Sequence, residues 1–232
     1  MPTLQKIYQF FLSYPCPVCR NIVNNKKNSI CDNCLDDIIL FQKPICPSCG
    51  GEQNGILDIC QKCITNGPFQ WRKATALYKM EKLGKELIHI YKYSKKHELI
   101  RPIALLATKQ LQGKLEDIDY IISVPLYWKR KFFRGFNQSD LLAQIISNET
   151  GVKKSNKIIK RIRNTSQQAL LKKEEREKNL KGAFVANKKL CENRRFLLVD
   201  DVMTTGSTLK EITNILLNAG ALSVDIFVIA RR

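Results

Sequence analysis

The sequence contains no run of about 18 uncharged apolar residues, so it predicts no membrane-spanning helix and no membrane insertion. An apolar stretch near the start, residues 7–14, is short and is interrupted by polar residues. Because it also lacks a basic leader and a small-residue cleavage site, it does not fit a secretion signal, and a cytoplasmic location is expected. Thiols stay reduced in that compartment, so the nine cysteines are predicted to bind metal rather than to form disulfides.

Acidic residues are scarce, with 21 aspartates and glutamates against 39 lysines and arginines, and the formal net charge is +18. The excess lies almost entirely in one part of the chain: residues 1–70 carry six basic and five acidic residues, whereas residues 71–232 carry 33 and 16. A basic excess of this size favours a polyanionic partner, either a nucleic acid or a phosphorylated metabolite. A surface that is merely solvated by lysine would give the same count, and the sequence leaves both interpretations open.

Eight of the nine cysteines form four C-x-x-C pairs within a short N-terminal segment. The pairs are Cys16/Cys19, Cys31/Cys34, Cys46/Cys49 and Cys60/Cys63. The first and third pairs share the form Cys-Pro-x-Cys, so the segment is an internal repeat in which each copy supplies four thiolates. Two such turns complete a closed tetrahedral site, and the pattern therefore predicts two structural zinc ions. Redox-active dithiols are the alternative, but the thioredoxin-like strand and helix that they need are absent from this pattern.

The spacing does not decide whether the pairs combine sequentially or interleave, although sequential pairing is simpler because each repeat then closes on itself. A segment this polar cannot build a large core, so metal binding must supply its folding energy. We therefore predict a zinc-binding module over residues 1–68 and a second domain over residues 69–232. The ninth cysteine, Cys191, lies in a remote polar segment and is predicted to take no part in either site.

The second part of the chain alternates helical and strand patterns after a connector at residues 64–73. Helices are predicted over residues 80–93, 98–112, 138–149 and 207–218, and strands over residues 120–124, 156–162, 184–186, 196–199 and 224–230. That alternation predicts an α/β fold in which a parallel sheet is flanked by helices.

The most informative segment runs from Phe196 to Leu209. An apolar strand ends in two adjacent carboxylates, Asp200 and Asp201, and a loop of small hydroxyl residues and glycine follows before a helix begins. Ligands bind at such strand-to-helix turns in parallel sheets. Backbone N–H groups, hydroxyls and a helix N-terminus over residues 204–208 favour a phosphate monoester, whereas the carboxylates suit ribose hydroxyls or a magnesium ion.

This segment is not a Walker A loop, because the G-x-x-x-x-G-K-[ST] spacing is missing. It resembles the motif that binds 5-phosphoribosyl-1-pyrophosphate (PRPP) in type I phosphoribosyltransferases, which is an apolar strand, then Asp-Asp, then Thr-Thr-Gly. The resemblance implies a type I phosphoribosyltransferase-like sheet, and it assigns Asp200 and Asp201 to the ribose 2- and 3-hydroxyls and magnesium. The residues that it assigns to the 5-phosphate are Thr204, Thr205, Gly206, Ser207 and Thr208.

Further segments resemble the ComF family and extend the resemblance over about residues 13–231. They are Arg134-Gly135-Phe136-Asn137-Gln138, the spaced pattern Arg163, Gln167, Arg176, Asn179 and Gly182-Ala183-Phe184, the segment Tyr91-Lys92-Tyr93, and the four C-x-x-C pairs. ComF proteins are bacterial and cytoplasmic, and they act in natural competence on incoming single-stranded DNA. The resemblance therefore implies a role in DNA uptake, with single-stranded DNA and a competence helicase or ATPase as partners.

The family fold also implies contacts with the pyrophosphate of PRPP. The residues concerned are Val124, Pro125, Arg130, Arg134, Arg163 and Arg176. The first two form the turn after the first predicted strand, which is the usual pyrophosphate loop, and the next two lie in a basic cluster that follows it. The last two lie in or near residues 163–182, where this fold carries a flexible lid. Each of these cations could equally be a solvated surface residue.

One position departs from the family pattern and leaves the reaction open. Some purine phosphoribosyltransferases carry an aspartate base at the first position of the phosphate loop, where this chain has Thr204. Neither His89 nor His97 falls in a predicted ligand-binding loop, so the sequence names no catalytic base.

Three interpretations of the function therefore remain. The chain is a phosphoribosyltransferase of unknown acceptor that works in DNA uptake, a non-catalytic adaptor that binds DNA and protein and keeps a regulatory PRPP site, or a nucleotide salvage enzyme. The zinc module and the basic excess favour the first two over the third.

Overall fold

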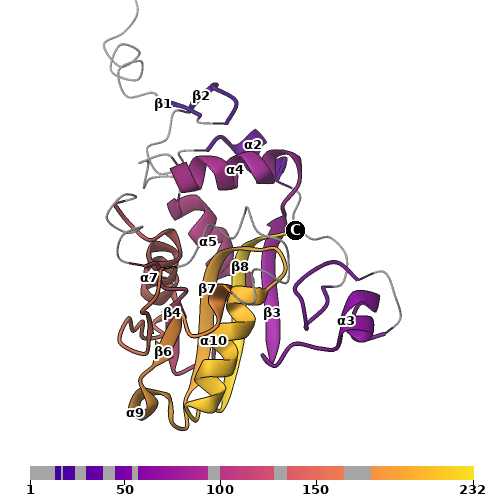
Figure 1. The fold of residues 1–232 in the computed structure, drawn as a ribbon. Coiled ribbons are helices and arrows are strands. Elements are labelled where there is room, and N and C mark those ends of the chain that lie inside the picture. The colour runs from indigo at the N-terminus through magenta and orange to yellow at the C-terminus, as the bar shows by residue number, and fades with distance from the viewer. Residues whose placement is uncertain are drawn as a thin grey trace, which may run out of the picture.

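The computed structural model describes residues 14–16, 18–23, 30–38, 45–53, 57–93, 100–127, 135–164 and 179–232. Its centre is a four-stranded sheet in the order β3-β8-β7-β4, with all neighbours parallel (Figure 1). The strands are β3 (Lys73–Lys79), β8 (Ser223–Arg231), β7 (Arg195–Met203) and β4 (Tyr120–Ser123). The inner strand β8 is buried along nearly its whole length, as expected for a parallel sheet that is covered on both faces. The predicted α/β fold with a parallel sheet is confirmed.

Helices cover both faces of this sheet. Three lie on one face, α4 (Lys82–Tyr93), α5 (Ile100–Leu111) and α7 (Gln138–Thr150), and α10 (Ser207–Asn218) lies on the other (Figure 1). Successive residues of β7 point to opposite faces, so Leu197 and Val199 pack in the first core, whereas Phe196 and Leu198 pack in the second. Among the described residues, no helix is both long enough and apolar enough to cross a membrane.

A small two-stranded antiparallel sheet adds to the face that carries α10. It consists of β5 (Ile159–Arg161) and β6 (Phe184–Ala186), and the short helix α9 (Lys188–Cys191) follows it. Cys191 lies in a polar segment away from both four-cysteine repeats, as predicted, but its side chain is fully buried in the second core. The preceding lysines of α9 are exposed, and the helix turns only its last residue inward, which a polar composition does not reveal.

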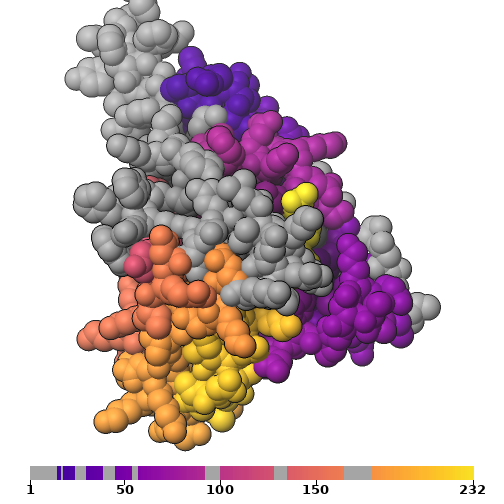
Figure 2. Space-filling model, in the orientation of Figure 1, coloured from indigo at the N-terminus to yellow at the C-terminus, as the bar shows by residue number. Residues whose placement is uncertain are grey.

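The two cysteine repeats lie at two separate places. The first repeat forms β1 (Tyr14–Pro15), β2 (Ile22–Val23) and α2 (Asp32–Asp36) next to α4, and the second carries α3 (Gln61–Asn66) beside β3 (Figure 1). In the space-filling view, the purple segment around α3 lies against the yellow C-terminal elements (Figure 2). Cysteines of the first repeat join the core that contains α4, and those of the second join the core that contains α10. The predicted division at residues 68 and 69 stays a prediction.

The connector predicted at residues 64–73 is shorter in the structure. Helix α3 continues to Asn66 and β3 begins at Lys73, so residues 67–72 make the connection. Strand β3 was not predicted because alanine and lysine are poor strand formers. Hydrogen bonding to β8 stabilises this strand despite its low intrinsic strand propensity. The other predicted helices and strands are present with ends shifted by a few residues, and β7 continues beyond its predicted end to Met203.

Candidate ligand site and metal centres

The two adjacent carboxylates lie within β7 rather than after it. Asp200 is opposite Val228 of β8 in the parallel register, and both Asp200 and Asp201 are half-buried. Since β4 and β7 are parallel neighbours, the segments that follow Ser123 and Met203 leave the sheet at the same edge. The structure therefore places at the same end of the sheet the two segments that the family resemblance assigns to pyrophosphate and to ribose 5-phosphate.

Ser139 orients one of these carboxylates, although no motif in the sequence pointed to it. Its Oγ donates a hydrogen bond of 2.9 Å to Oδ1 of Asp200, and the N–H of Asp201 donates to the same oxygen at 2.8 Å. Ser139 is buried in the first turn of α7, which packs against β7. The sequence signal that could have identified Ser139 is its position directly after Asn137-Gln138, the end of the ComF-like motif. Two donors on one oxygen hold the Asp200 carboxylate in one orientation.

Two buried tyrosines lie in the electrostatic field of the acidic pair. Burial and, after it, the negative charge of Asp201 raise the pKa of the Tyr78 hydroxyl, and the same two causes raise the pKa of Tyr91. Both hydroxyls therefore stay protonated at neutral pH. The Tyr91 hydroxyl donates to the carbonyl of Gln138 at 2.9 Å, which joins α4 to the start of α7. This side of the site thus carries neutral donors rather than further charge.

The turn from β7 into α10 combines a glycine N-cap with a pair of hydroxyl side chains. Gly206 is the N-cap of α10 with a φ of 77°, a left-handed conformation that favours glycine. The hydroxyl oxygens of Thr205 and Ser207 are 2.8 Å apart, and the Ser207 N–H donates to the Thr205 hydroxyl at 3.4 Å. A helix of 12 residues begins here, so the N–H groups of its first turn point toward the turn and favour an anion.

The backbone of Val124 is engaged within the protein. Its N–H donates to the Val199 carbonyl at 3.0 Å, and its carbonyl accepts a hydrogen bond of 3.0 Å from Nδ2 of Asn137. Pro125 has no N–H to donate. A backbone contact of this turn with pyrophosphate would therefore have to come from residues beyond Pro125, and the assignment of Val124 and Pro125 to pyrophosphate stays a prediction.

Of the four arginines assigned to pyrophosphate, the structure describes one. Arg163 is exposed, and its Nη2 donates to the carbonyls of Asn179 and Lys181 at 3.0 and 2.5 Å. It thereby joins the two ends of the segment predicted as a lid. Arg130, Arg134 and Arg176 lie outside the described residues.

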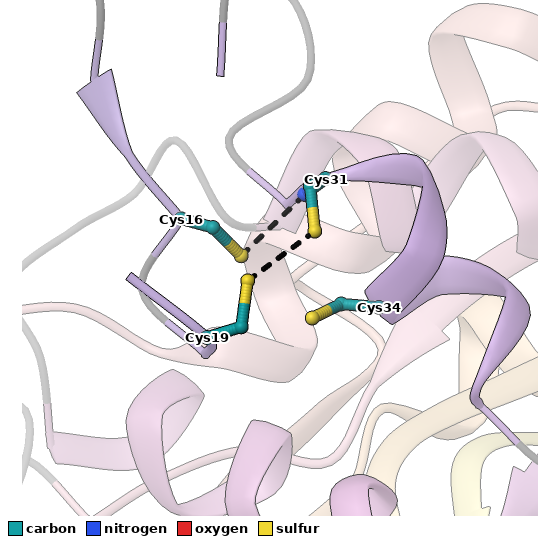
Figure 3. Close-up of side chains that lie close together, drawn as sticks. All are labelled: Cys16, Cys19, Cys31 and Cys34. Carbon is teal, nitrogen blue, oxygen red and sulfur yellow. Dashed lines mark hydrogen bonds between the residues drawn. The ribbon is translucent and has the colours of Figure 1, made fainter. Parts of the chain in front are cut away.

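The eight paired cysteines form two clusters, each made by one repeat. The clusters are Cys16, Cys19, Cys31 and Cys34, and Cys46, Cys49, Cys60 and Cys63, with the sulfurs of each within 4.8 Å of one another. The sulfurs of Cys19 and Cys31 are 3.5 Å apart (Figure 3), and those of Cys49 and Cys60 are 3.6 Å apart. Zinc–sulfur bonds of about 2.3 Å in a tetrahedron separate sulfurs by about 3.8 Å, so both clusters fit zinc. Sequential pairing is confirmed.

Backbone donors and burial complete each cluster. The N–H of Cys31 points to the sulfur of Cys16 at 3.5 Å (Figure 3), and the N–H of Cys60 points to that of Cys46 at 3.3 Å. Burial is the main cause that raises the pKa of the Cys49 thiol to about 12, and the nearby Cys46 adds to it. Four thiolates cannot persist together there without a cation, so metal binding must displace their protons. These two four-cysteine sites support structural zinc.

Freshly purified protein is therefore expected to contain close to two zinc ions per chain, bound by cysteine alone. Both clusters are complete without Cys191, which is buried elsewhere. Elemental analysis against protein concentration checks this, and a Cys191→Ala variant with an unchanged zinc content serves as the control. An average of less than one zinc ion per chain would contradict the assignment.

Two family models match the chain. The double zinc ribbon domain matches residues 7–67, and the phosphoribosyl transferase domain matches residues 141–232, which include β7, the turn after it and α10. With the parallel sheet and the two four-cysteine clusters, these matches define a phosphoribosyltransferase-like protein that carries an N-terminal double zinc ribbon.

Relatives are similar over nearly the whole chain. It is 35% identical to Competence protein F of Haemophilus influenzae, in an alignment that covers 95% of this chain and 98% of that protein. It is 33% identical to the DNA utilization protein YhgH of Escherichia coli over 93% of this chain and 96% of that protein. Competence protein ComFC of Bacillus subtilis is 26% identical, with coverages of 87% and 84%. The chain belongs to the ComF family.

Solved phosphoribosyltransferase structures show a more distant likeness. The glutamine PRPP amidotransferase of Bacillus subtilis, complexed with ADP and GMP, is 17% identical with a TM-score of 0.43, over 61% of this chain and 30% of that one. The adenine phosphoribosyltransferase of Thermoanaerobacter pseudethanolicus is 14% identical with a TM-score of 0.38, over 60% of this chain and 83% of that one.

Proposed function

We propose that this ComF-family chain binds PRPP together with magnesium at the turn that follows β7. The observation that carries the proposal is the succession of an acidic pair, Asp200 and Asp201, and the N-terminus of α10 at Gly206 on one strand-to-helix turn. The carboxylates suit ribose hydroxyls and magnesium, and the helix N-terminus suits a phosphate dianion. A ribose that carries a 5-phosphate presents both groups on one ring.

The proposed roles follow from this arrangement. Residues 204–208 hold the 5-phosphate, Asp200 and Asp201 hold the ribose hydroxyls and magnesium, and Ser139 keeps Asp200 oriented. Magnesium supplies charge neutralisation at the pyrophosphate group when it is bound. In a transfer reaction, the bond from C1 of ribose to pyrophosphate breaks as the acceptor bonds to C1, and the transition state resembles an oxocarbenium ion. Arg130, Arg134, Arg163 and Arg176 stay proposed contacts for the leaving pyrophosphate.

Isothermal titration calorimetry of the purified chain with PRPP tests the ligand. Binding is expected with magnesium and is expected to weaken strongly when EDTA removes it, because the acidic pair would then face the ligand's negative charge without a cation. Zinc analysis after the EDTA step checks that the structural sites are still loaded. Absence of any binding heat with magnesium present would refute the proposed ligand.

Pyrophosphate release separates a transferase from an adaptor. A phosphoribosyltransferase releases pyrophosphate from PRPP when its acceptor is present, so the chain is incubated with PRPP, magnesium and a panel of acceptors. Release that depends on DNA would place transfer in DNA uptake, and release with a free nucleobase alone would favour salvage. PRPP binding without release from any acceptor would favour a regulatory site in an adaptor.

We further propose that the chain works in DNA uptake. The names of two relatives, Competence protein F and DNA utilization protein YhgH, support this proposal. Within the described residues, Lys157, Lys160 and Arg163 are exposed on β5 and just beside it, near Ile162, which is 60% exposed. Exposed cations suit the phosphates of a single strand.

Single-stranded DNA is expected to bind with little sequence preference and to dissociate steeply as salt rises, because each phosphate that the protein neutralises releases a counterion. Reversal of charge in the basic cluster, by Lys129→Glu, Arg130→Glu and Lys131→Glu together, is expected to flatten the salt slope by roughly 0.7 for each phosphate that is no longer neutralised. Fluorescence anisotropy at several salt concentrations measures the slope. Lys62→Glu, on the nearly neutral N-terminal part, is the control.

No binding of single-stranded DNA at low salt would remove direct contact from the proposal. The route to DNA uptake would then run through a protein partner, for which a competence helicase or ATPase is the proposed class.

A further inference from the structure

One arginine links the second cysteine cluster directly to the candidate phosphate loop. Nε of Arg231, at the end of β8, donates to the carbonyl of Cys49 at 3.0 Å. Its Nη1 donates to the carbonyl of Thr204 at 2.6 Å and to that of Met203 at 3.1 Å. A guanidinium is rigid and planar, so a metal ligand and the first residue of the loop are held at a set separation by one group.

A pair of stacked rings makes a second link. Phe69 and Trp71 have ring centroids 4.0 Å apart and nearly parallel planes. Nε1 of Trp71 donates to the carbonyl of Ser48 at 2.6 Å, within the Cys46-Pro47-Ser48-Cys49 turn. Both rings also approach Gly206 so closely that a Cβ there would lie 3.3 Å from each. The rings are therefore anchored on the cysteine turn and support the glycine of the loop.

The cysteine turn is itself joined to the sheet. The N–H of Ala74 in β3 donates to the carbonyl of Pro47 at 2.6 Å, and Nζ of Lys79 pairs with Glu52 at 2.5 Å. Cys46, Cys49 and Cys63 are buried in the same core as Trp71 and Met203. The first cluster packs instead in the core of the opposite face, with α4. The two metal sites thus have different neighbours, although their sequences repeat.

We infer that the second four-cysteine site is a positioning element for the phosphate loop, through Arg231 and Trp71. When metal is bound, the Cys46–Cys49 turn has one conformation, and its Ser48 and Cys49 carbonyls set the places of the Trp71 ring and the Arg231 guanidinium. These two side chains in turn set the backbone of residues 203–206. Among the described residues, the first four-cysteine site packs in the core with α4, and we assign it no such role. The link to PRPP rests on the proposed function, but the ordering of the loop by the metal site does not.

Amide hydrogen exchange of the ligand-free, zinc-loaded full chain measures this ordering. Cys60→Ser in the second cluster and Cys31→Ser in the first are matched, because each cysteine is half-buried and its N–H points to the first sulfur of its own repeat. Cys60→Ser is expected to speed exchange in residues 203–209 by about tenfold or more, since the loop opens more often. Cys31→Ser is expected to unfold the first repeat and to leave exchange in residues 203–209 nearly unchanged. Equal exchange of the loop in both variants would overturn the inference.

If Cys60→Ser fails to fold, a variant that keeps all metal ligands tests whether Arg231 orders the loop. Arg231→Gln is expected to keep two zinc ions by elemental analysis and still to speed exchange of the loop, because a shorter amide cannot reach both the Cys49 and Thr204 carbonyls. Arg194→Gln removes the same charge at the opposite end of β7 and is the control. Loop exchange in Arg231→Gln that matches Arg194→Gln would contradict the role of Arg231.

Calorimetry with PRPP and magnesium then connects loop order to binding. Cys60→Ser and Arg231→Gln are expected to lower PRPP affinity by about tenfold, with the larger loss in the variant whose loop exchanges faster. Cys31→Ser and Arg194→Gln are expected to bind PRPP with the affinity of the parent chain. If the parent chain fails to bind PRPP, the proposed ligand is wrong. The hydrogen-exchange measurements still test the link between the metal site and the loop, because they use no PRPP.

Discussion

The double variant Asp200→Asn/Asp201→Asn is expected to lose magnesium-dependent PRPP binding. In the proposed site, each carboxylate supplies a charge-assisted contact to ribose hydroxyls or magnesium, and the loss of each contact is expected to cost about 1.5–3 kcal/mol. Together they correspond to a weakening of roughly a hundred-fold to ten-thousand-fold. Asparagine keeps the shape of the side chain and can still accept the Ser139 hydrogen bond, so the loss is electrostatic rather than a consequence of repacking. Calorimetry with and without magnesium measures the change.

Asp119→Asn is the matched control for this double variant. Asp119 lies just before β4, at the amino ends of the strands, where its carboxylate accepts the N–H of Arg195 at 2.8 Å. The control removes one carboxylate charge, where the double variant removes two, and it weakens a similar backbone hydrogen bond away from the turn after β7. PRPP affinity is expected to stay unchanged in the control. Unchanged affinity in the double variant itself would refute the assignment of Asp200 and Asp201.

Gly206→Ala is expected to disrupt the phosphate loop even though it adds a single carbon. The left-handed φ of 77° costs an alanine about 1–2 kcal/mol. The new Cβ would also lie 2.9 Å from Cε of Met203 and 3.3 Å from each of the Phe69 and Trp71 rings. The Met203 side chain can bend away, but the stacked rings are held by the cysteine turn, so the loop must move. We expect the variant to lose stability and, in the fraction that stays folded, to bind PRPP more than about tenfold more weakly.

Gly151→Ala separates backbone strain from crowding. Gly151 ends α7 with a φ of 75°, and a Cβ added there would meet nothing within 4 Å. Urea unfolding is expected to show a similar backbone cost in both variants, with the larger total in Gly206→Ala. Calorimetry is expected to show PRPP binding unchanged in Gly151→Ala. A Gly206→Ala variant that behaves like Gly151→Ala in both measurements would show that the rings do not confine the loop.

Much of the site could be predicted because it is local in sequence. A C-x-x-C turn places two sulfurs together wherever it folds, and a strand, an acidic pair and a glycine turn before a helix form one contiguous unit. The same locality explains why most helices and strands of the sheet were predicted with small shifts at their ends. Strand β3 was missed because its stability comes from pairing with β8, about 150 residues later in the chain, and not from its own alanines and lysines.

By itself, the sequence predicted which cysteines cluster into metal sites, which turn is the candidate ligand site and which class of sheet carries that turn, since each depends on residue types at short spacing. Only the tertiary structure decided that the cysteine pairs combine sequentially, that Ser139 orients Asp200, and that Cys191 is buried. Only the tertiary structure showed that Arg231 donates hydrogen bonds to the carbonyls of both Cys49 and Thr204. Arg231 and Cys49 are 182 positions apart in the sequence. Such contacts depend on which faces of the assembled sheet the two repeats cover, and no local pattern encodes that choice.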